Sequence, residues 1–145
     1  VILEIPKIIK KSFNPDVILA IGGGGLIPSR IMREKLGVPI YVVSLSPYDE
    51  NDNQIDVPRI IQWMDFSDLR DKKILIVDEV DDTRKTLGFL TDKLVNEEGI
   101  NMRNLGIFVL HNKTKQKYVD LKDLKVYYYH PSTHLPDKWI VYPWD

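Results

Sequence analysis

The chain has 145 residues, which favours a single domain spanning 1–145. Lysine and arginine number 20 against 21 aspartate and glutamate residues, so the net charge is −1, which argues against a nucleic-acid partner bound through a basic face. The lack of cysteine excludes disulfide bonds and thiolate zinc sites, and no apolar run approaches the ~20 residues of a membrane span, so we expect a soluble, cytoplasmic protein without a membrane partner.

The apolar pattern predicts helices and strands that alternate along the chain. Residues 2–11 have the spacing of an amphipathic helix, and a fully apolar strand is expected at 17–21. The other expected elements are helices at about 26–36 and 84–98, and strands at 40–45, 59–64 (or a hairpin arm), 73–77, 105–110, 125–129 and 138–142. Because fully apolar strands alternate with helices, we expect an α/β fold with a central, mainly parallel sheet flanked by helices.

The polar segment SPYDENDNQIDVP at 46–58 is predicted to be a long loop, since it is acidic and contains prolines. Loops of this length are uncommon in compact domains and often act as lids over a site. The alternative is a surface turn that only improves solubility.

Four glycines at 22–25 follow the first apolar strand and precede a helix. Glycine lets a ligand approach backbone amides closely, and the amides at a helix start favour an anion. The dinucleotide pattern Gly-x-Gly-x-x-Gly is not matched, because its third glycine position falls on Ile27 or Pro28. A phosphate or pyrophosphate loop is the better interpretation, and a tight turn without a ligand is the alternative.

A second pattern, ILIVDEVDDTRKTL at 74–87, carries four carboxylates within positions 78–82. Carboxylates this close repel one another unless a cation binds. Residues 83–86, Thr-Arg-Lys-Thr, follow at a predicted helix start, where amides, hydroxyls and cations suit a phosphate monoester. A sugar phosphate with a magnesium ion would satisfy both halves. An acidic helix cap and a magnesium-binding receiver domain are the alternatives.

These motifs resemble those of type I phosphoribosyltransferases. VDEVDDTRKTL is similar to their phosphoribosyl-pyrophosphate signature, AIGGGGLIPSR to their pyrophosphate loop, SPYDENDNQ to their mobile catalytic loop, and LPDKWIVYPWD to the C-terminal hood of the xanthine and hypoxanthine-guanine enzymes. The resemblance extends from about residue 16 to the last residue, and it implies the fold of that family with a small C-terminal hood at about 111–145 and a mobile loop at about 46–58.

The resemblance also implies an activity. A magnesium-dependent enzyme would transfer the 5-phosphoribosyl group from phosphoribosyl pyrophosphate to N9 of a 6-oxopurine (guanine, xanthine or hypoxanthine), in purine salvage. The product would be a purine nucleoside monophosphate, and the enzyme would be a homodimer or homotetramer. The alternative is a non-catalytic regulator of the same fold that senses phosphoribosyl pyrophosphate.

Individual roles follow from the same resemblance. Asp82 would be the catalytic residue, handling the proton of purine N7. The residues implied to bind phosphoribosyl pyrophosphate are Gly23, Gly24, Ser46, Tyr48, Asp78, Glu79, Asp82, Thr83, Arg84, Lys85 and Thr86. The residues implied to bind the purine are Lys113, Trp139, Ile140 and Asp145. Magnesium would be bound by Asp78, Glu79 and Asp145.

Two positions depart from the family's pattern. Gly23 stands where lysine or arginine is frequent, so the positive group for the pyrophosphate would come from Arg30, the mobile loop or a neighbouring subunit. Arg84 replaces a frequent glycine of the phosphate loop.

Three features are interpreted differently when the resemblance is set aside. Lys113 would be one lysine of a solvated loop, and Trp139 would be a core residue. The tyrosines at 127–129 would serve packing or an oligomer surface.

Overall fold

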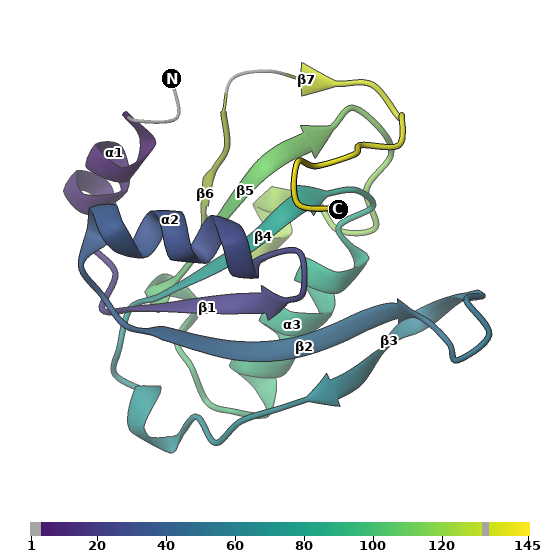
Figure 1. The fold of residues 1–145 in the computed structure, drawn as a ribbon. Helices are drawn as coiled ribbons and strands as arrows, with labels where there is room; N and C mark the ends of the chain where they lie inside the picture. The colour runs from purple at the N-terminus through teal and green to yellow at the C-terminus, as the bar shows by residue number, and fades with distance from the viewer. Residues whose placement is uncertain (1–3, 132–133) are drawn as a thin grey trace.

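The computed structural model describes residues 4–131 and 134–145, which form a sheet with helices on both faces (Figure 1). The helices are α1 (Ile5–Ser12), α2 (Leu26–Leu36), α3 (Lys85–Asn96) and α4 (Leu121–Leu124), with 3-10 turns at Ser67–Leu69 and Met102–Asn104. The strands are β1 (Val17–Gly22), β2 (Ile40–Tyr48), β3 (Gln54–Gln62), β4 (Ile74–Asp81), β5 (Leu105–Lys113), β6 (Tyr127–Tyr129) and β7 (His134–Leu135).

The strand order in the sheet is β3-β2-β1-β4-β5-β6. β7 also pairs with β5, nearer to the carboxyl end of that strand than β6 does. All pairings are parallel except that of β2 with β3, so the prediction of a mainly parallel sheet is confirmed. In parallel strands the carboxyl ends lie at one edge of the sheet, where ligands of such folds bind. The glycine turn after β1 and the acidic end of β4 therefore meet at the same edge.

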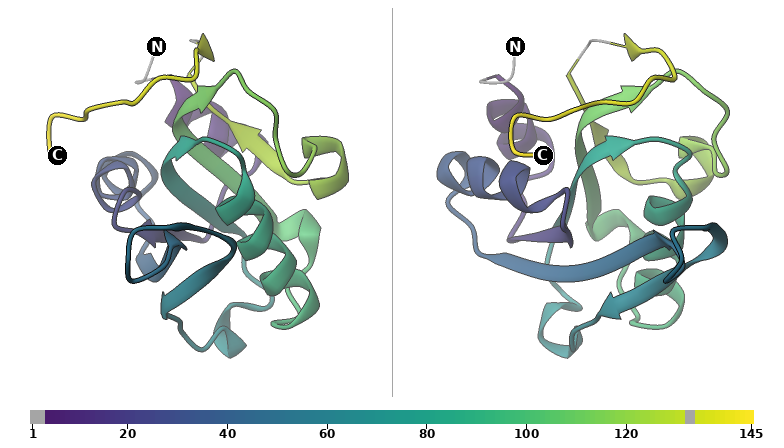
Figure 2. Two further views of the ribbon diagram at one scale, coloured as in Figure 1. Left: turned by 90° about the vertical axis from the view of Figure 1, so that its right-hand side faces the viewer. Right: turned by 45° about the vertical axis from the view of Figure 1, so that its right-hand side comes forward.

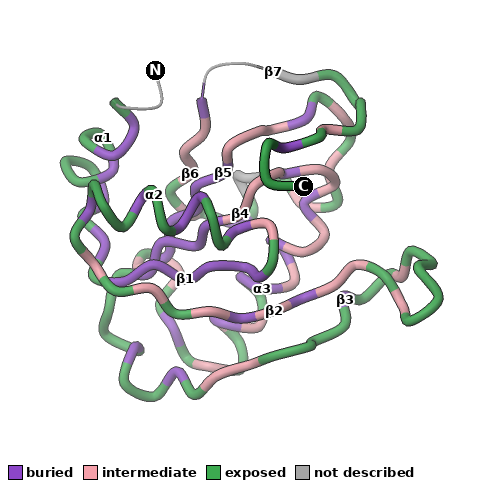
Figure 3. Tube along the Cα trace, viewed as in Figure 1, coloured by how far each residue is buried: buried purple, intermediate pink, exposed green. Residues whose placement is uncertain are grey.

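Apolar side chains cover both faces of the sheet. Ile9 of α1 and Met32 of α2 pack on one face, and Leu90 and Leu94 of α3 pack on the other. The left view of Figure 2 shows α2 and α3 on opposite sides of the strands. β1 is buried along its whole length (Figure 3), and its sequence is continuously apolar because both of its faces are covered.

The prediction of a long loop at 46–58 is wrong, because most of this segment belongs to a β-hairpin. β2 and β3 extend into it, and only residues 49–53 form a turn. The Asp49 carboxylate stabilises the turn by accepting hydrogen bonds from the backbone N–H groups of Asn51 and Asn53, at 2.8 and 2.9 Å. Pro58 is tolerated because β3 is the edge strand of the sheet, and Pro47 lies at an irregularity of the β2–β3 pairing, beyond the last residue of β2 that pairs with β1.

The prediction of a strand at 138–142 is also wrong. The short strand β7, which was not predicted, pairs with β5, and the chain then crosses the carboxyl edge of the sheet without regular structure (Figure 1). Tyr142 is buried, but Trp139 is 83% exposed, so the interpretation of Trp139 as a core residue is wrong as well.

The other predicted elements are present with shifted ends. β4 and β5 extend past their predicted ends to Asp81 and Lys113, and α3 is shorter than predicted. Residues 2 and 3 of the helix predicted at 2–11 lie outside the described residues, as do 132 and 133 of the predicted hood. In the part of the chain that the structure describes, no helix has the length and apolarity needed to cross a membrane.

Candidate functional site

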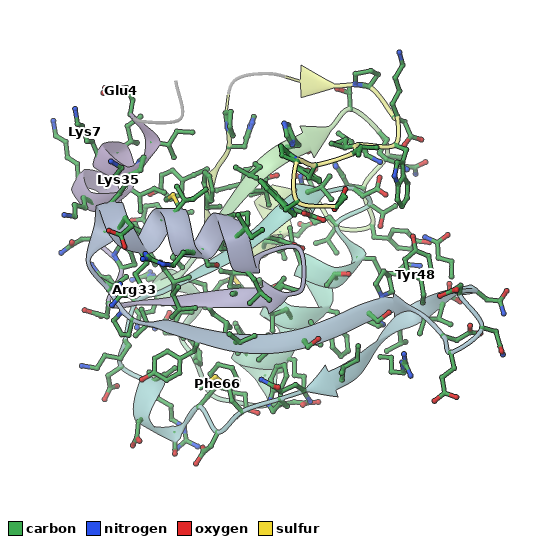
Figure 4. The ribbon with its side chains drawn as sticks, in the orientation of Figure 1. Glu4, Lys7, Arg33, Lys35, Tyr48 and Phe66 are labelled. Atoms are coloured by element: carbon green, nitrogen blue, oxygen red, sulfur yellow. The ribbon has the colours of Figure 1, made fainter. Side chains whose placement is uncertain are left out.

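A cavity of about 490 Å³ lies at the carboxyl edge of the sheet, within the size range of small-molecule sites. The predicted site residues that line it are Gly23, Gly24, Tyr48, Asp78, Glu79, Asp82, Thr83, Arg84, Lys85, Thr86, Lys113, Trp139, Ile140 and Asp145. Tyr48 reaches it from the end of β2, near the hairpin turn (Figure 4). Ser46, also described, lies outside the lining, and its hydroxyl bonds to the backbone of Tyr48.

The glycine turn brings the backbone against β4. A Cβ on Gly25 would lie 2.2 Å from the carbonyl oxygen of Val77, a contact that only glycine avoids without moving the strand. A Cβ on Gly24 would lie 2.5 Å from the carboxyl carbon of Glu79, a side chain that can move aside. Gly25 is thus needed for the approach of the turn to β4, and Gly24 keeps room for Glu79.

Gly23 faces open space. No atom lies within 4 Å of the position that its Cβ would occupy, so packing does not explain why this residue is a glycine. The peptide bond between Gly22 and Gly23 is cis. Arg30, one of the suggested replacements for the missing cation, instead pairs with Glu34 on the exposed side of α2.

The pKa values of Asp78 and Glu79, near the end of β4, are both raised above the usual range of carboxyl groups. Burial, together with the charges of Glu79 and Asp81, raises the pKa of Asp78 to about 7. Burial and the charge of Asp145 raise the pKa of Glu79, although the indole N–H of Trp144 donates to its Oε2 at 3.4 Å. A bound cation would relieve this mutual repulsion.

The carboxyl groups at this end of β4 fit a magnesium ion that takes some of its ligands from the protein and the others from a substrate. Within the described ranges, no three His, Cys, Asp or Glu side chains are grouped as in a preformed metal site. Asp78, Glu79 and Asp145 therefore do not form a complete site alone, although all three line the cavity. Magnesium in enzymes commonly takes one or two carboxylates and completes its shell with water and substrate phosphate oxygens.

Asp82 faces two lysines, one at the end of β5 and one two residues further along the chain. Its Oδ1 lies 3.0 Å from Nζ of Lys115 and 3.5 Å from Nζ of Lys113. Asp137 contacts the same two lysines from the C-terminal segment, at 3.1 and 3.8 Å. Lys113 is buried as the last residue of β5, so the interpretation of a solvated loop lysine is wrong.

Residues 83–86 form the turn into α3, and the two cationic side chains of this turn are bonded to other groups of the protein. The Arg84 guanidinium donates to Asp81, and Lys85 Nζ donates to the carbonyl oxygen of Ile55 at 3.0 Å. An anion at this turn would therefore meet the backbone amides of the helix start and the two threonine hydroxyls.

Tyr142 fastens the C-terminal segment to the acidic end of β4. Its hydroxyl donates to the carbonyl oxygen of Glu79 at 3.3 Å and lies 2.9 Å from Nδ1 of His111. Burial and the nearby carboxylates raise the pKa of Tyr142, which keeps the phenol protonated. Its ring stacks on Trp144, and its backbone N–H donates to Asp145 Oδ2 at 2.8 Å. These contacts hold the segment over the cavity.

Sequence reasoning missed several residues that shape the site: Asp81, Lys115, Lys117, Tyr128 and Tyr142. The alternation of lysines in HNKTKQK was an available signal, because every second residue of an extended segment lies on the same side. Asp81 stood inside the recognised acidic run without a role of its own. The partners of Tyr128 and Tyr142 lie far from them in the sequence, so no local pattern indicates these contacts.

The chain is similar to proteins that act on purines. The family model described as phosphoribosyl transferase domain matches residues 5–143. The hypoxanthine-guanine phosphoribosyltransferase of Schizosaccharomyces pombe is 44% identical, over 94% of this chain and 80% of its own length. Xanthine phosphoribosyltransferase 1 of Saccharomyces cerevisiae is 39% identical, over 95% of this chain and 80% of its own length.

A solved structure is similar over almost the whole chain. The crystal structure of a hypothetical protein from Neisseria gonorrhoeae with bound ppGpp has a TM-score of 0.82 and 36% identity, and the match covers 99% of this chain and 82% of that one.

Proposed function

Since the chain is an enzyme of the phosphoribosyltransferase family, we propose that it transfers the 5-phosphoribosyl group of phosphoribosyl pyrophosphate to N9 of a 6-oxopurine. Its relatives act in purine salvage. The comparisons confirm the resemblance inferred from the motifs. The proposal includes dependence on Mg²⁺, release of pyrophosphate and a nucleoside monophosphate, and a cytoplasmic homodimer or homotetramer.

The observation that carries the proposal is that a single cavity is lined by three groups of residues. They are the helix-start turn at 83–86, the carboxyl groups of Asp78 and Glu79, and the proposed base-binding residues Lys113, Trp139 and Ile140. The 5′-phosphate would lie at residues 83–86, on the amides of the helix start. The ribose hydroxyls would lie at Asp78 and Glu79. The pyrophosphate would lie against Gly23 and Gly24, where the open space leaves room for it.

The base would lie between Lys113 and the C-terminal segment. The Lys113 ammonium would donate to the 6-oxo oxygen, which guanine, xanthine and hypoxanthine share. Trp139 suits stacking on a planar base, because an exposed indole at a cavity wall gains most of its burial from the ligand. The backbone of Ile140 and the neighbourhood of Asp145 would face the purine 2-position, where the three bases differ.

The chemistry follows from these positions. As pyrophosphate leaves, the sugar acquires positive charge, and the carboxylates of Asp78 and Glu79 stabilise it. The carboxylate of Asp82 accepts the proton of purine N7, and Lys113 and Lys115 keep that carboxylate in place. Mg²⁺ held by Asp78, Glu79 and Asp145 would neutralise the leaving pyrophosphate. The tyrosine-fastened C-terminal segment excludes water from the sugar.

The direct test is nucleotide formation from each base. The purified protein should form a nucleoside monophosphate from at least one of guanine, xanthine and hypoxanthine when phosphoribosyl pyrophosphate and Mg²⁺ are present, and a chelator should stop the reaction. Adenine is the matched control, because an amino group replaces the 6-oxo oxygen that Lys113 would contact. Binding of phosphoribosyl pyrophosphate without turnover of any base would favour the regulator instead.

We further propose that the same cavity accepts ppGpp, which the similar protein from Neisseria gonorrhoeae binds. This nucleotide has the base and 5′-phosphoryl group of GMP, which would be the product formed from guanine, so it would occupy the base-binding residues and the 83–86 turn together. We expect inhibition that is competitive with phosphoribosyl pyrophosphate: the apparent KM rises with the concentration of ppGpp, and kcat does not change. A fall in kcat at constant KM would place the nucleotide elsewhere.

A further inference from the structure

A buried charge cluster of Asp81, Arg84 and Tyr128 lies behind the phosphate-binding turn. Asp81 is 1% exposed and Arg84 is 6% exposed. Nε and Nη2 of Arg84 donate to Oδ2 of Asp81 at 2.8 and 2.7 Å, and the Tyr128 hydroxyl donates to the same oxygen at 2.6 Å. Burial and the Asp81 charge raise the pKa of Tyr128, which keeps the phenol a donor. The proposed chemistry uses none of these three side chains.

The turn is also held from the side of the segment that follows β5. Nζ of Lys117 donates to the backbone carbonyl oxygens of Asp81, at 2.7 Å, and of Asp82. The backbone N–H of Tyr118 donates to the carbonyl oxygen of Thr83 at 2.8 Å. Consecutive residues of the turn are therefore fixed by groups that lie far from them in the chain.

Arg84 occupies a conformation that glycine adopts most easily. Its φ is +65°, in the left-handed region, which is unfavourable for residues with a Cβ. A glycine here would reach this conformation without help. With arginine, the bonds to Asp81 hold the backbone in place, and the guanidinium is directed into the protein.

We propose that the Asp81–Arg84 pair, braced by Tyr128, is a positioning device that fixes the phosphate-binding turn and thereby sets the affinity for phosphoribosyl pyrophosphate; this inference rests on the proposed function. A role in stability alone would not require charges, because apolar residues of similar volume often replace a buried ion pair without loss of stability. The pair instead keeps residues 82–86 in one geometry, in which their amides converge on the 5′-phosphate.

The decisive variant is Asp81→Leu/Arg84→Met, which removes both charges and keeps most of the volume. We expect it to fold with a lower Tm, because the Tyr128 hydroxyl loses its acceptor. The KM and the calorimetric Kd for phosphoribosyl pyrophosphate should rise about tenfold or more, and the KM for the base should stay within about twofold. A structural role alone would not separate the two substrates in this way.

Two further variants make the result decisive. Leu94→Ala removes a buried side chain of α3 away from the turn, so it should lower the Tm without changing the affinity for phosphoribosyl pyrophosphate. Tyr128→Phe removes only the hydroxyl, and it should raise the KM for phosphoribosyl pyrophosphate about threefold with a smaller fall in Tm than that of Leu94→Ala. It serves as the test if the double variant does not fold.

The inference is overturned if the folded double variant binds phosphoribosyl pyrophosphate with unchanged affinity. If the double variant does not fold, unchanged affinity in Tyr128→Phe overturns it. Either result leaves the proposed function intact. Failure of the wild type to form any nucleotide overturns the proposed function instead, and the calorimetric Kd then still decides the inference.

Discussion

Asp82→Asn should lower kcat by about 10²–10⁴-fold and leave the affinity for phosphoribosyl pyrophosphate within about twofold. Asparagine has the size of aspartate, and its oxygen can still face Lys115 and Lys113, but it cannot take the proton from purine N7. The side chain of Asp82 is 46% exposed, whereas its neighbour Asp81 is buried, so Asp82 is the carboxylate of this pair that can reach a base.

Steady-state kinetics, combined with calorimetry of phosphoribosyl pyrophosphate binding, measures both quantities. The matched control is Asp137→Asn, because Asp137 contacts the same two lysines from the C-terminal segment. It should lower kcat less than about tenfold. Wild-type turnover in Asp82→Asn would remove Asp82 from its role. An equal loss in both variants would assign the effect to the position of the lysines.

Asp78→Asn should stabilise the substrate-free protein at high pH while removing most of its activity. The pKa of Asp78 is about 7 in the folded protein, against 3.8 for an exposed aspartate. The unfolded chain therefore loses its proton near pH 4, whereas the folded protein keeps it until near pH 7. The free energy of unfolding consequently falls as pH rises through this window and stays low above it.

The size of this effect follows from the two pKa values. Their difference corresponds to at most about 4 kcal/mol, and partial contact of Asp78 with water reduces it, so we expect about 1–2 kcal/mol. Asparagine removes the penalty and keeps an oxygen for the Glu79 backbone N–H, which donates to Asp78 Oδ1 at 2.8 Å. At pH 8 the Tm should rise by about 3–8 °C.

Thermal unfolding without Mg²⁺ at pH 5 and pH 8 tests this result. The gain from Asp78→Asn should be larger at pH 8, and the exposed control Asp71→Asn should show no such difference. Equal gains at both pH values would contradict the explanation. In addition, Mg²⁺ with phosphoribosyl pyrophosphate should raise the Tm of the wild type much more than that of Asp78→Asn.

The elements predicted best are those with a complete local signal in the sequence. The strand predicted at 17–21 is observed at Val17–Gly22, and the helix predicted at 26–36 is observed at Leu26–Leu36. Continuous burial leaves a continuous apolar run, and a glycine past the end of a helix marks its stop, so both are visible locally. The edge strand β3 has water on one side and no sheet neighbour beyond it, so its sequence resembled that of a loop.

The same distinction holds for the site. Residues 78–86 are contiguous, and their carboxylates and hydroxyls carry a local motif. The contacts of Lys115 with Asp82 and Asp137 join three separate parts of the chain, so they depend on the folded arrangement. The path of the C-terminal segment likewise depends on Tyr142, whose partners Glu79 and His111 are distant in sequence.

The β2–β3 hairpin has a consequence for closure over a substrate. An irregular loop must lose most of its backbone freedom when it orders on a ligand, which costs about 1–2 kcal/mol of conformational entropy per residue. In the hairpin, strand pairing and the Asp49 turn have already removed much of that freedom. Lys85 of α3 also donates to the carbonyl oxygen of Ile55, close to the turn of the hairpin. If this hairpin covers a bound substrate, little of the binding energy would be lost to ordering its backbone.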